Sequence, residues 1–400
     1  MEQQLLDACT HCGFCLPTCP TYGVLWQQEA DSPRGRIHLM QGLLDGTVSL
    51  NEVTVSHFDR CLGCMACVTA CPSGVRYDRL IEQTRAHVEE RFERGSEDWL
   101  LRALTFSILP HPRRMRALLP LARLGSHLPL PGALRPFSEL APSWRSSERA
   151  PERTPAAGPR RMRVGLLTGC VQRTLFGDVN AATARVLAAD GCEVIAPRGQ
   201  RCCGALHLHA GRREEGHARA ERLERVFLEQ GVEALVVNSA GCGSHLKEAG
   251  LDLPVCDVSE LVVELASGVA RSPLPIRVAF QDSCHLAHAQ RIREAPRALL
   301  RRIPELVLLE PAEQEICCGS AGIYNLVQPE AARELGDRKA ERVLATGAEV
   351  YVSANPGCLV QVAAALRRSG RPLPALHPIE LVDASLAGVQ PASLLAAARG

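Results

Sequence analysis

Hydrophobic and polar positions follow two patterns along the 400-residue chain. In its first third, apolar residues recur in short amphipathic stretches, which predicts helices over 37–44, 77–94, 100–109 and 115–124. After residue 160, short apolar runs alternate with charged helical stretches, which predicts buried parallel strands joined by helices. We expect these strands at 163–167, 192–196, 234–237, 255–258, 277–280, 306–309 and 349–352, with intervening helices at 180–189, 215–230, from 259, 296–302 and 329–345.

The second pattern occurs twice, and cysteines follow equivalent strands in both copies. Cys170 and Cys284 are 114 residues apart, the two Cys-Cys-Gly motifs 115, and Cys242 and Cys358 116. This regular offset indicates an internal duplication. Because ligands lie at the carboxyl ends of parallel strands, each half should gather four thiols at one edge of its sheet. We favour a metal or redox role over buried packing for these residues: Cys170, Cys202, Cys203 and Cys242, then Cys284, Cys317, Cys318 and Cys358.

The composition of the chain excludes some kinds of function. The chain has 18 cysteines, a net charge of +1 and 4% aromatic residues, so the charge and the aromatic content do not favour binding to nucleic acid. The first residues do not resemble a secretion signal, and no apolar run is long enough to span a membrane. We therefore expect a cytoplasmic protein, where dense cysteines bind metal or do redox chemistry rather than form disulfides.

Eight cysteines near the N-terminus form two copies of the run C-x2-C-x2-C-x3-C-P. This is the spacing of bacterial two-cluster ferredoxins, in which the fourth cysteine of each run binds the other cluster. A structural zinc site is the alternative, but zinc fits a cysteine triplet poorly. We expect two neighbouring 4Fe-4S clusters that carry electrons, one held by Cys9, Cys12, Cys15 and Cys71, and the other by Cys61, Cys64, Cys67 and Cys19.

The remaining stretches are less specific. Between the cysteine runs, the arginines of residues 33–36 could dock a partner or face solvent, and we favour the solvent-facing position. Residues 105–163 are rich in Pro and Arg, and their second half, 142–159, should have little regular structure. We interpret this stretch as an interdomain arm, with peripheral contact to the inner face of the cell membrane as an alternative. Histidines near the repeat cysteines could carry protons, bind metal or simply be solvated: His207, His209, His285 and His288.

Four segments are expected. They are a two-cluster domain over 1–95, a linker with short helices over 96–160, and two Cys-Cys-Gly domains over 161–270 and 275–390. The fold class is an α+β, ferredoxin-like and largely helical N-terminal domain followed by two duplicated α/β domains with parallel sheets. The chain has no nucleotide or flavin motif. A two-electron substrate usually needs a flavin to split the electron pair, so FAD is expected only on partner subunits.

Several strings resemble the family of glycolate oxidase iron–sulfur subunits. They are C-x-H-C-G-F-C at 9–15, D-S-P-R-G-R-I at 31–37, D-R-C-L-x-C at 59–64, C-P-S-G-V-R-Y at 71–77, N-A-A-T-A-R-V-L at 180–187 and C-C-G-S-A-G-I-Y at 317–324. The resemblance implies a glycolate dehydrogenase subunit, inactive on substrate alone, that passes electrons from flavin subunits to a quinone-type acceptor. The alternatives are the equivalent subunit for lactate or glycerol 3-phosphate, a heterodisulfide-reductase-like thiol reductase, and a metal-stabilised scaffold.

The chain departs from one motif of its wider group. Relatives with a catalytic cluster in these repeats end each half with C-x-x-C, but here Ser239 and Asn355 replace the first cysteine. A five-thiolate cluster is therefore not expected. Four ligands per half leave open a third, ordinary cluster or thiols without metal.

Overall fold

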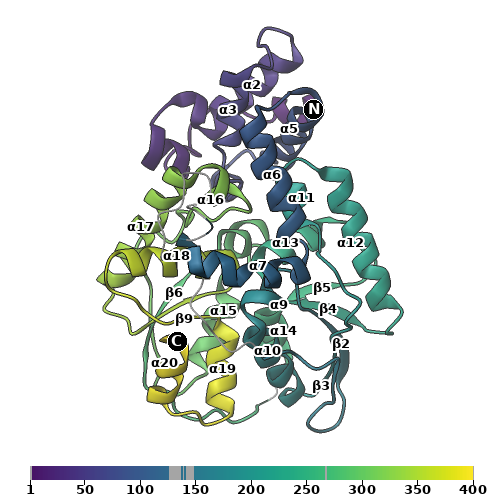
Figure 1. Cartoon of the computed structure of the whole chain (residues 1–400), viewed down its shortest axis with the longest axis vertical. Coiled ribbons are helices and arrows are strands. Elements are labelled where there is room, and N and C mark those ends of the chain that lie inside the picture. The colour runs from purple at the N-terminus through teal and green to yellow at the C-terminus, as the bar shows by residue number, and fades with distance from the viewer. Residues whose placement is uncertain (1, 126–136, 138, 141–147, 266–267, 400) are drawn as a thin grey trace.

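The computed structural model describes residues 2–125, 137, 139–140, 148–265 and 268–399. A helical N-terminal part lies at one end of the molecule, and two α/β units form the rest (Figure 1). Within residues 2–125 the described chain forms helices and no strand, so only the largely helical character of the predicted α+β domain is seen. These helices are α1 (Gln3–Asp7), η1 (Thr21–Trp26), η2 (Glu29–Asp31), α2 (Pro33–Leu44), α3 (Glu52–Asp59), α4 (Ala66–Ala70), α5 (Tyr77–Arg91), α6 (Ser96–Ile108) and α7 (Pro112–Gly125).

The four helices expected in this part are confirmed, with shifted ends. α2 begins four residues earlier than predicted because the side chain of Ser32 accepts a hydrogen bond from Gly35 N and caps the helix. α5 ends at Arg91, three residues before the predicted end. Met40, Phe58, Leu80 and Ile81, all fully buried, form the centre of the small core among α2, α3 and α5.

The first α/β unit has a five-stranded sheet in the order β1-β3-β2-β4-β5. Its strands are β1 (Arg153–Thr154), β2 (Met162–Leu167), β3 (Cys192–Ile195), β4 (Ala234–Val237) and β5 (Val255–Asp257). β2 to β5 pair in parallel, whereas β1 pairs antiparallel with β3 inside the stretch that was expected to lack regular structure. The helices of this unit are α9 (Gln172–Leu175), α10 (Gly177–Ala189), α11 (Ala205–His209), α12 (Arg213–Leu228), α13 (Ala240–Glu248) and α14 (Val258–Leu265).

The second unit repeats this arrangement. Its parallel sheet has the order β7-β6-β8-β9, which corresponds strand for strand to β3-β2-β4-β5 and agrees with the predicted duplication. The strands are β6 (Arg277–Gln281), β7 (Val307–Leu309), β8 (Val350–Ser353) and β9 (Ala375–Leu376). Its helices are η4 (His285–Ala289), α15 (Glu294–Arg301), α16 (Tyr324–Val327), α17 (Pro329–Ala345), α18 (Pro356–Arg368), α19 (Pro378–Leu386) and α20 (Pro391–Arg399).

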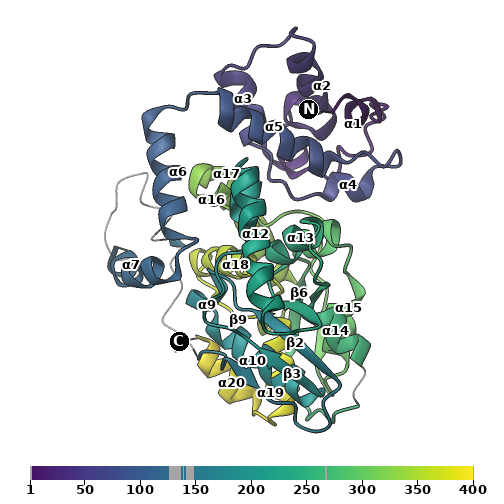
Figure 2. The ribbon, with the colours of Figure 1, turned by 90° about the vertical axis from the view of Figure 1, so that its right-hand side faces the viewer.

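The three parts are joined by packing and by polar contacts. One buried cluster contains residues of both sheets, for example Val164 and Val278. α6 descends from the N-terminal part along the α/β units, and the N-terminal part lies over the loops that follow their strands (Figure 2). There His285 Nε2 lies 3.0 Å from the carbonyl oxygen of Gly63. Among the helices described, none has the length and apolarity needed to cross a membrane.

Candidate functional site

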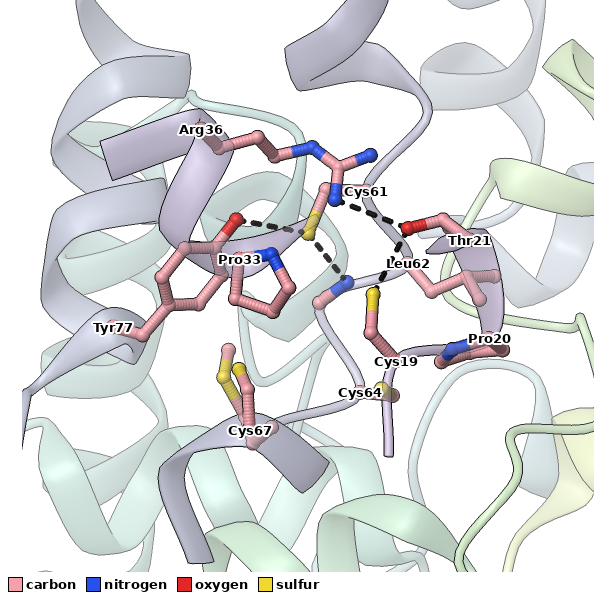
Figure 3. Close-up of a pocket in the computed structure, with 12 residues that line it drawn as sticks. Cys19, Pro20, Thr21, Pro33, Arg36, Cys61, Leu62, Cys64, Cys67 and Tyr77 are labelled. Atoms are coloured by element: carbon pink, nitrogen blue, oxygen red, sulfur yellow. Dashed lines mark hydrogen bonds between the residues drawn. The ribbon is translucent and has the colours of Figure 1, made fainter. Parts of the chain in front are cut away.

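The second cysteine run and Cys19 surround one pocket in the N-terminal part. Cys61 and Cys64 lie on the loop between α3 and α4, Cys67 lies in the first turn of α4, and Cys19 lies just before η1 (Figure 3). The loop can turn this tightly because Gly63 and Met65 adopt positive φ angles. The pocket holds about 310 Å³ of empty space, and all four cysteines are buried. Four soft sulfur ligands around a hollow, rather than around a point, suit a metal cluster.

Polar groups surround the sulfur atoms of this pocket (Figure 3). Gly63 N donates to Cys61 Sγ at 3.4 Å, and the Tyr77 hydroxyl donates to the same sulfur at 3.6 Å. Thr21 Oγ1 lies 3.1 Å from Cys19 Sγ. Hydrogen bonds of this kind stabilise negative charge on sulfur, and around iron–sulfur clusters they help to set the reduction potential.

Arg36 also lines this pocket, and the expectation that it faces solvent was wrong. Its side chain is 1% exposed and donates to the His57 carbonyl at 2.6 Å and to Thr21 Oγ1 at 3.1 Å. It also pairs with the fully buried carboxylate of Asp31 at 3.4 Å. A buried guanidinium is tolerated only with such partners, which the sequence pattern did not reveal. Burial opposes ionisation of the Cys61 thiol, but Arg36 and Arg85 lower its pKa below the ordinary value.

The first cysteine run and Cys71 surround a second pocket. Cys9, Cys12, Cys15 and Cys71 line about 410 Å³ of empty space. This pocket shares wall residues with the first one, namely Pro33, Cys67 and Tyr77, so the two are neighbours. It lies nearer the surface, because Cys12 is exposed and Phe14 beside it is 65% exposed. Cys19 of the first run thus lies at the pocket of the second run, Cys71 of the second run lies at the pocket of the first, and Cys67 lines both pockets.

The repeat cysteines gather in two further groups, one in each α/β unit. Cys170 and Cys202 have their sulfur atoms 3.7 Å apart, and Cys203 contacts both Cys202 and Cys242. The second unit has the same chain of contacts, from Cys284 to Cys317, Cys318 and Cys358. The last cysteine of each group lies in the first turn of a helix, α13 or α18, rather than at the strand end itself. The leftover Cys192 is fully buried in the core, and Cys256 is partly buried on β5.

The two groups differ in their distance from the N-terminal part. Cys317 belongs to the same buried cluster as Leu62 and Cys64, and Cys284 packs against that cluster. The thiols of the second unit therefore border the pocket of Cys19 and Cys61. This asymmetry could not be predicted from the sequence, because the two repeats carry the same motifs.

The two residues that replace cysteine in the C-x-x-C motif occupy equivalent places in the two repeats. Ser239 and Asn355 each precede a helix, α13 and α18. Asn355 donates to Cys358 Sγ at 3.6 Å and accepts from Gly241 N, in the other unit, at 3.3 Å. Asn355 thus connects the two repeats near their thiol groups.

The four candidate histidines lie at the joint between the three parts, where His207 and His288 are buried and His209 and His285 are partly buried. His207 Nε2 lies 3.3 Å from Glu215, the rings of His209 and His285 are 4.7 Å apart, and His288 Nδ1 lies 2.7 Å from Thr69 Oγ1. Burial lowers the pKa of His209 and His285, and lowers that of His288 to about 4. These three imidazoles are therefore neutral near pH 7.

Comparisons with known proteins agree with this geometry. Residues 5–75 match the family described as 4Fe-4S dicluster domain, and residues 164–247 and 278–363 each match the family described as cysteine-rich domain. A protein of Bacillus subtilis (strain 168) described as a probable glycolate oxidase iron–sulfur subunit is 35% identical, covering 92% of this chain and 90% of its own. The glycolate oxidase iron–sulfur subunit of Escherichia coli (strain K12) is 38% identical, covering 96% and 94%.

The chain belongs to the glycolate oxidase iron–sulfur subunit family. The resemblance drawn from the sequence is confirmed over nearly the whole chain, and so is the assignment as an iron–sulfur electron-transfer subunit. Lactate utilization protein A of Oceanobacillus iheyensis is 29% identical and covers 56% of this chain and 97% of its own. A relative named for lactate utilization therefore matches more than half of this chain.

Proposed function

We propose that this chain carries electrons within a glycolate-oxidising complex, from flavin-containing partner subunits to a quinone. In this proposal residues 1–95 form a ferredoxin-type domain with two 4Fe-4S clusters, residues 96–160 a linker, and residues 161–270 and 275–390 the two Cys-Cys-Gly domains. Such clusters accept and release one electron at a time. The observation that carries the proposal is the placement of all eight cysteines around two adjoining pockets.

The residues of the chain hold and tune these centres. Cys9, Cys12, Cys15 and Cys71 would hold one cluster, and Cys61, Cys64, Cys67 and Cys19 the other. The fit rests on the donor set, four sulfurs around each hollow, and on the backbone and hydroxyl donors that face Cys61. Arg36 supplies a buried positive charge beside the inner pocket, and the shared wall of Pro33, Cys67 and Tyr77 keeps the two centres adjacent.

Anaerobic reconstitution of the full chain tests the ligand assignment. Two clusters predict about eight irons per chain and two interacting paramagnetic centres after reduction. Cys19→Ser should remove the centre of Cys61, Cys64 and Cys67, whereas Cys71→Ser should remove the other. If each substitution instead damages the centre of its own run, the crossed assignment is wrong. Iron clearly above eight would place a third cluster at the repeat thiols.

The complex with its partners tests the electron source. Glycolate should reduce the clusters of wild-type complex, and glycolate-dependent reduction of a dye should be lost when the flavin subunits are omitted. Stronger cluster reduction by lactate than by glycolate would support the alternative suggested by the lactate utilization relative. Reduction of a disulfide by the isolated chain would instead favour a thiol reductase.

Peripheral contact with a membrane would bring the chain to a lipid-soluble quinone. Helices α6 and α7 expose large apolar side chains, at Trp99, Leu100, Leu104, Leu118 and Leu121. Exposed arginines on α7 lie at 113, 114 and 116. A surface that combines apolar side chains, a tryptophan and arginines is typical of helices that lie in the interface of an anionic membrane.

A further inference from the structure

A third cavity lies where the N-terminal part meets both α/β units. It holds about 440 Å³ of empty space, part of which is open to solvent. None of the cysteines lines it. Its walls come from α5, α6, α11, α16 and nearby loops, and its lining includes Arg85, Arg94, Arg102, Leu206, His209, Ile323, Tyr324 and Val327.

The two repeats contribute equivalent positions to this cavity. His209 lies seven residues after Cys202, and Tyr324 lies seven residues after Cys317, so the two are related by the same offset as the Cys-Cys-Gly motifs. Their segments face each other, because a Cβ placed on Gly322 would lie 3.8 Å from Leu206 and 4.0 Å from His209. The duplication therefore places one side chain from each half at the cavity, the imidazole of His209 and the phenol of Tyr324.

Both of these side chains have a buried polar atom without a partner. The hydroxyl of Tyr324, a residue only 4% exposed, has no hydrogen bond, and neither does Nε2 of His209. A buried polar group without a partner costs about 1–3 kcal/mol, so native proteins rarely keep one without a ligand or water to satisfy it. Two such atoms lining one cavity indicate a ligand with hydrogen-bonding groups.

The charges around the cavity favour a neutral ligand. Arg94 pairs with Asp59, Glu89 and Asp98 at 2.7, 2.9 and 3.1 Å, and Arg102 pairs with Asp98 at 3.0 Å. Arg85 donates to the carbonyl oxygens of His209 and Cys61. Each of the three arginines therefore already has partners within the protein, carboxylates for Arg94 and Arg102 and carbonyl oxygens for Arg85. The rest of the lining is largely apolar, which suits a flat ring.

Short contacts join this cavity to the pocket of Cys19 and Cys61. Arg85 bridges the backbone of His209 to that of Cys61, and the His285 ring lies between His209 and the carbonyl of Gly63. Tyr324 belongs to the same buried cluster as Cys64. The cavity is therefore one layer of side chains away from the inner cysteine pocket.

We propose that this cavity binds the headgroup of a quinone, with Tyr324 Oη and His209 Nε2 donating hydrogen bonds to its carbonyl oxygens. The proposal deepens the proposed function, on which it rests for the supply of electrons. Reduction of a quinone to a hydroquinone takes two electrons, which that function delivers singly, and two protons, which come from water. The exposed apolar residues of α6 lie on the helix that also supplies Arg102 to the cavity, so a lipid tail has an apolar surface nearby.

Binding to the oxidised, reconstituted full chain is the first test. Isothermal titration calorimetry with a water-soluble short-chain benzoquinone measures Kd without turnover. Tyr324→Phe and His209→Phe each remove one donor while keeping an aromatic ring, and each should raise Kd roughly five- to tenfold, as expected for one hydrogen bond. Tyr351→Phe is the matched control, because its buried hydroxyl bonds Gln281 away from this cavity, and Kd should be unchanged.

Turnover of the whole complex separates this proposal from the proposed function. Glycolate-dependent reduction of the benzoquinone should show a raised KM in Tyr324→Phe and His209→Phe, with ferricyanide reduction and cluster EPR signals unchanged. The cavity proposal is overturned if wild-type chain does not bind the quinone, or if all variants bind it equally. Absence of glycolate-dependent ferricyanide reduction in wild type would overturn the proposed function, while the calorimetry would still decide the cavity.

Discussion

Replacing Arg36 by glutamine should change one centre and leave its neighbour almost unaffected. The guanidinium is 1% exposed and is held by the His57 carbonyl, Thr21 Oγ1 and Asp31. Glutamine removes the positive charge but keeps an amide that can donate within the same space. Because a one-electron reduction adds negative charge, loss of this cation should lower the midpoint potential of the centre at Cys19, Cys61, Cys64 and Cys67.

The size of this shift in midpoint potential can be estimated from two consecutive contacts, Arg36 to Thr21 and Thr21 to Cys19. Arg36 Nη1 lies 3.1 Å from Thr21 Oγ1, which lies 3.1 Å from Cys19 Sγ, so the charge is within about 6 Å of the sulfur. At an effective dielectric constant of about 20, one unit charge at this distance is worth about 3 kcal/mol, or about 100 mV for one electron. Because the added electron would be shared over the whole centre and not held at this one sulfur, we expect a decrease of several tens of millivolts. Breaking the pair with buried Asp31 should also cost about 3 kcal/mol of stability.

Redox titration followed by EPR measures this prediction in the reconstituted chain. The centre of Cys9, Cys12, Cys15 and Cys71 serves as the internal reference, because its pocket is lined by Arg34 and not by Arg36. Arg36→Lys keeps the charge and should restore most of the potential. The electrostatic reasoning fails if Arg36→Gln shifts both potentials equally, or if Arg36→Lys shifts the inner centre as much as glutamine does.

Three further predictions concern stability and surface contacts. Gly35→Ala should destabilise the N-terminal part by about 1–3 kcal/mol, because the added Cβ would clash with the backbone carbonyl of Glu29. Gly95→Ala is the control, because its Cβ would meet open space and stability should hardly change. Thermal unfolding of the two variants measures the difference. Burial lowers the pKa of His377 to about 3, below its unfolded value. The unfolded state therefore binds a proton first as pH falls from about 6.5 towards 3, and the free energy of unfolding decreases over this range. His377→Asn should reduce the slope of the free energy of unfolding against pH by up to about 1.4 kcal/mol per pH unit. Trp99→Glu with Leu121→Glu should weaken co-sedimentation with anionic vesicles about tenfold or more, and equal sedimentation of wild type and variant would refute membrane contact through α6 and α7.

Most of the fold could be predicted because its pattern is local. β4 and α17 agree with their predicted bounds to the residue, since a short apolar run between turns and a proline-initiated amphipathic stretch are strong signals. β1 and β9 were missed because two residues carry no periodicity, and their pairing depends on a neighbouring strand. The π-helices η1 and η4 were also missed, because no simple spacing rule distinguishes them from ordinary turns.

The candidate site was predictable where sequence spacing alone defines it. Cysteine runs with fixed spacing pointed to two groups of four, and the strand-end rule pointed to the repeat thiols. Arg36 was missed, although it lies one turn before fully buried Met40 on the same face of α2. A charged residue on an otherwise apolar helix face is the signal that could have found it, provided that a buried carboxylate such as Asp31 was also in reach.

The asymmetry between the two repeats arises from the N-terminal part rather than from the repeats themselves. Each repeat has the same sheet order and the same chain of four thiols. The N-terminal part lies across both, and its pocket of Cys19 and Cys61 borders Cys317 of the second repeat, whereas the cavity beside it is lined by His209 of the first repeat and Tyr324 of the second. Equivalent positions therefore meet different surroundings, and a pair such as His209 and Tyr324 is free to diverge. The duplication therefore produced two equivalent groups of thiols at the ends of the strands, and the packing of the N-terminal part placed these two groups in different surroundings.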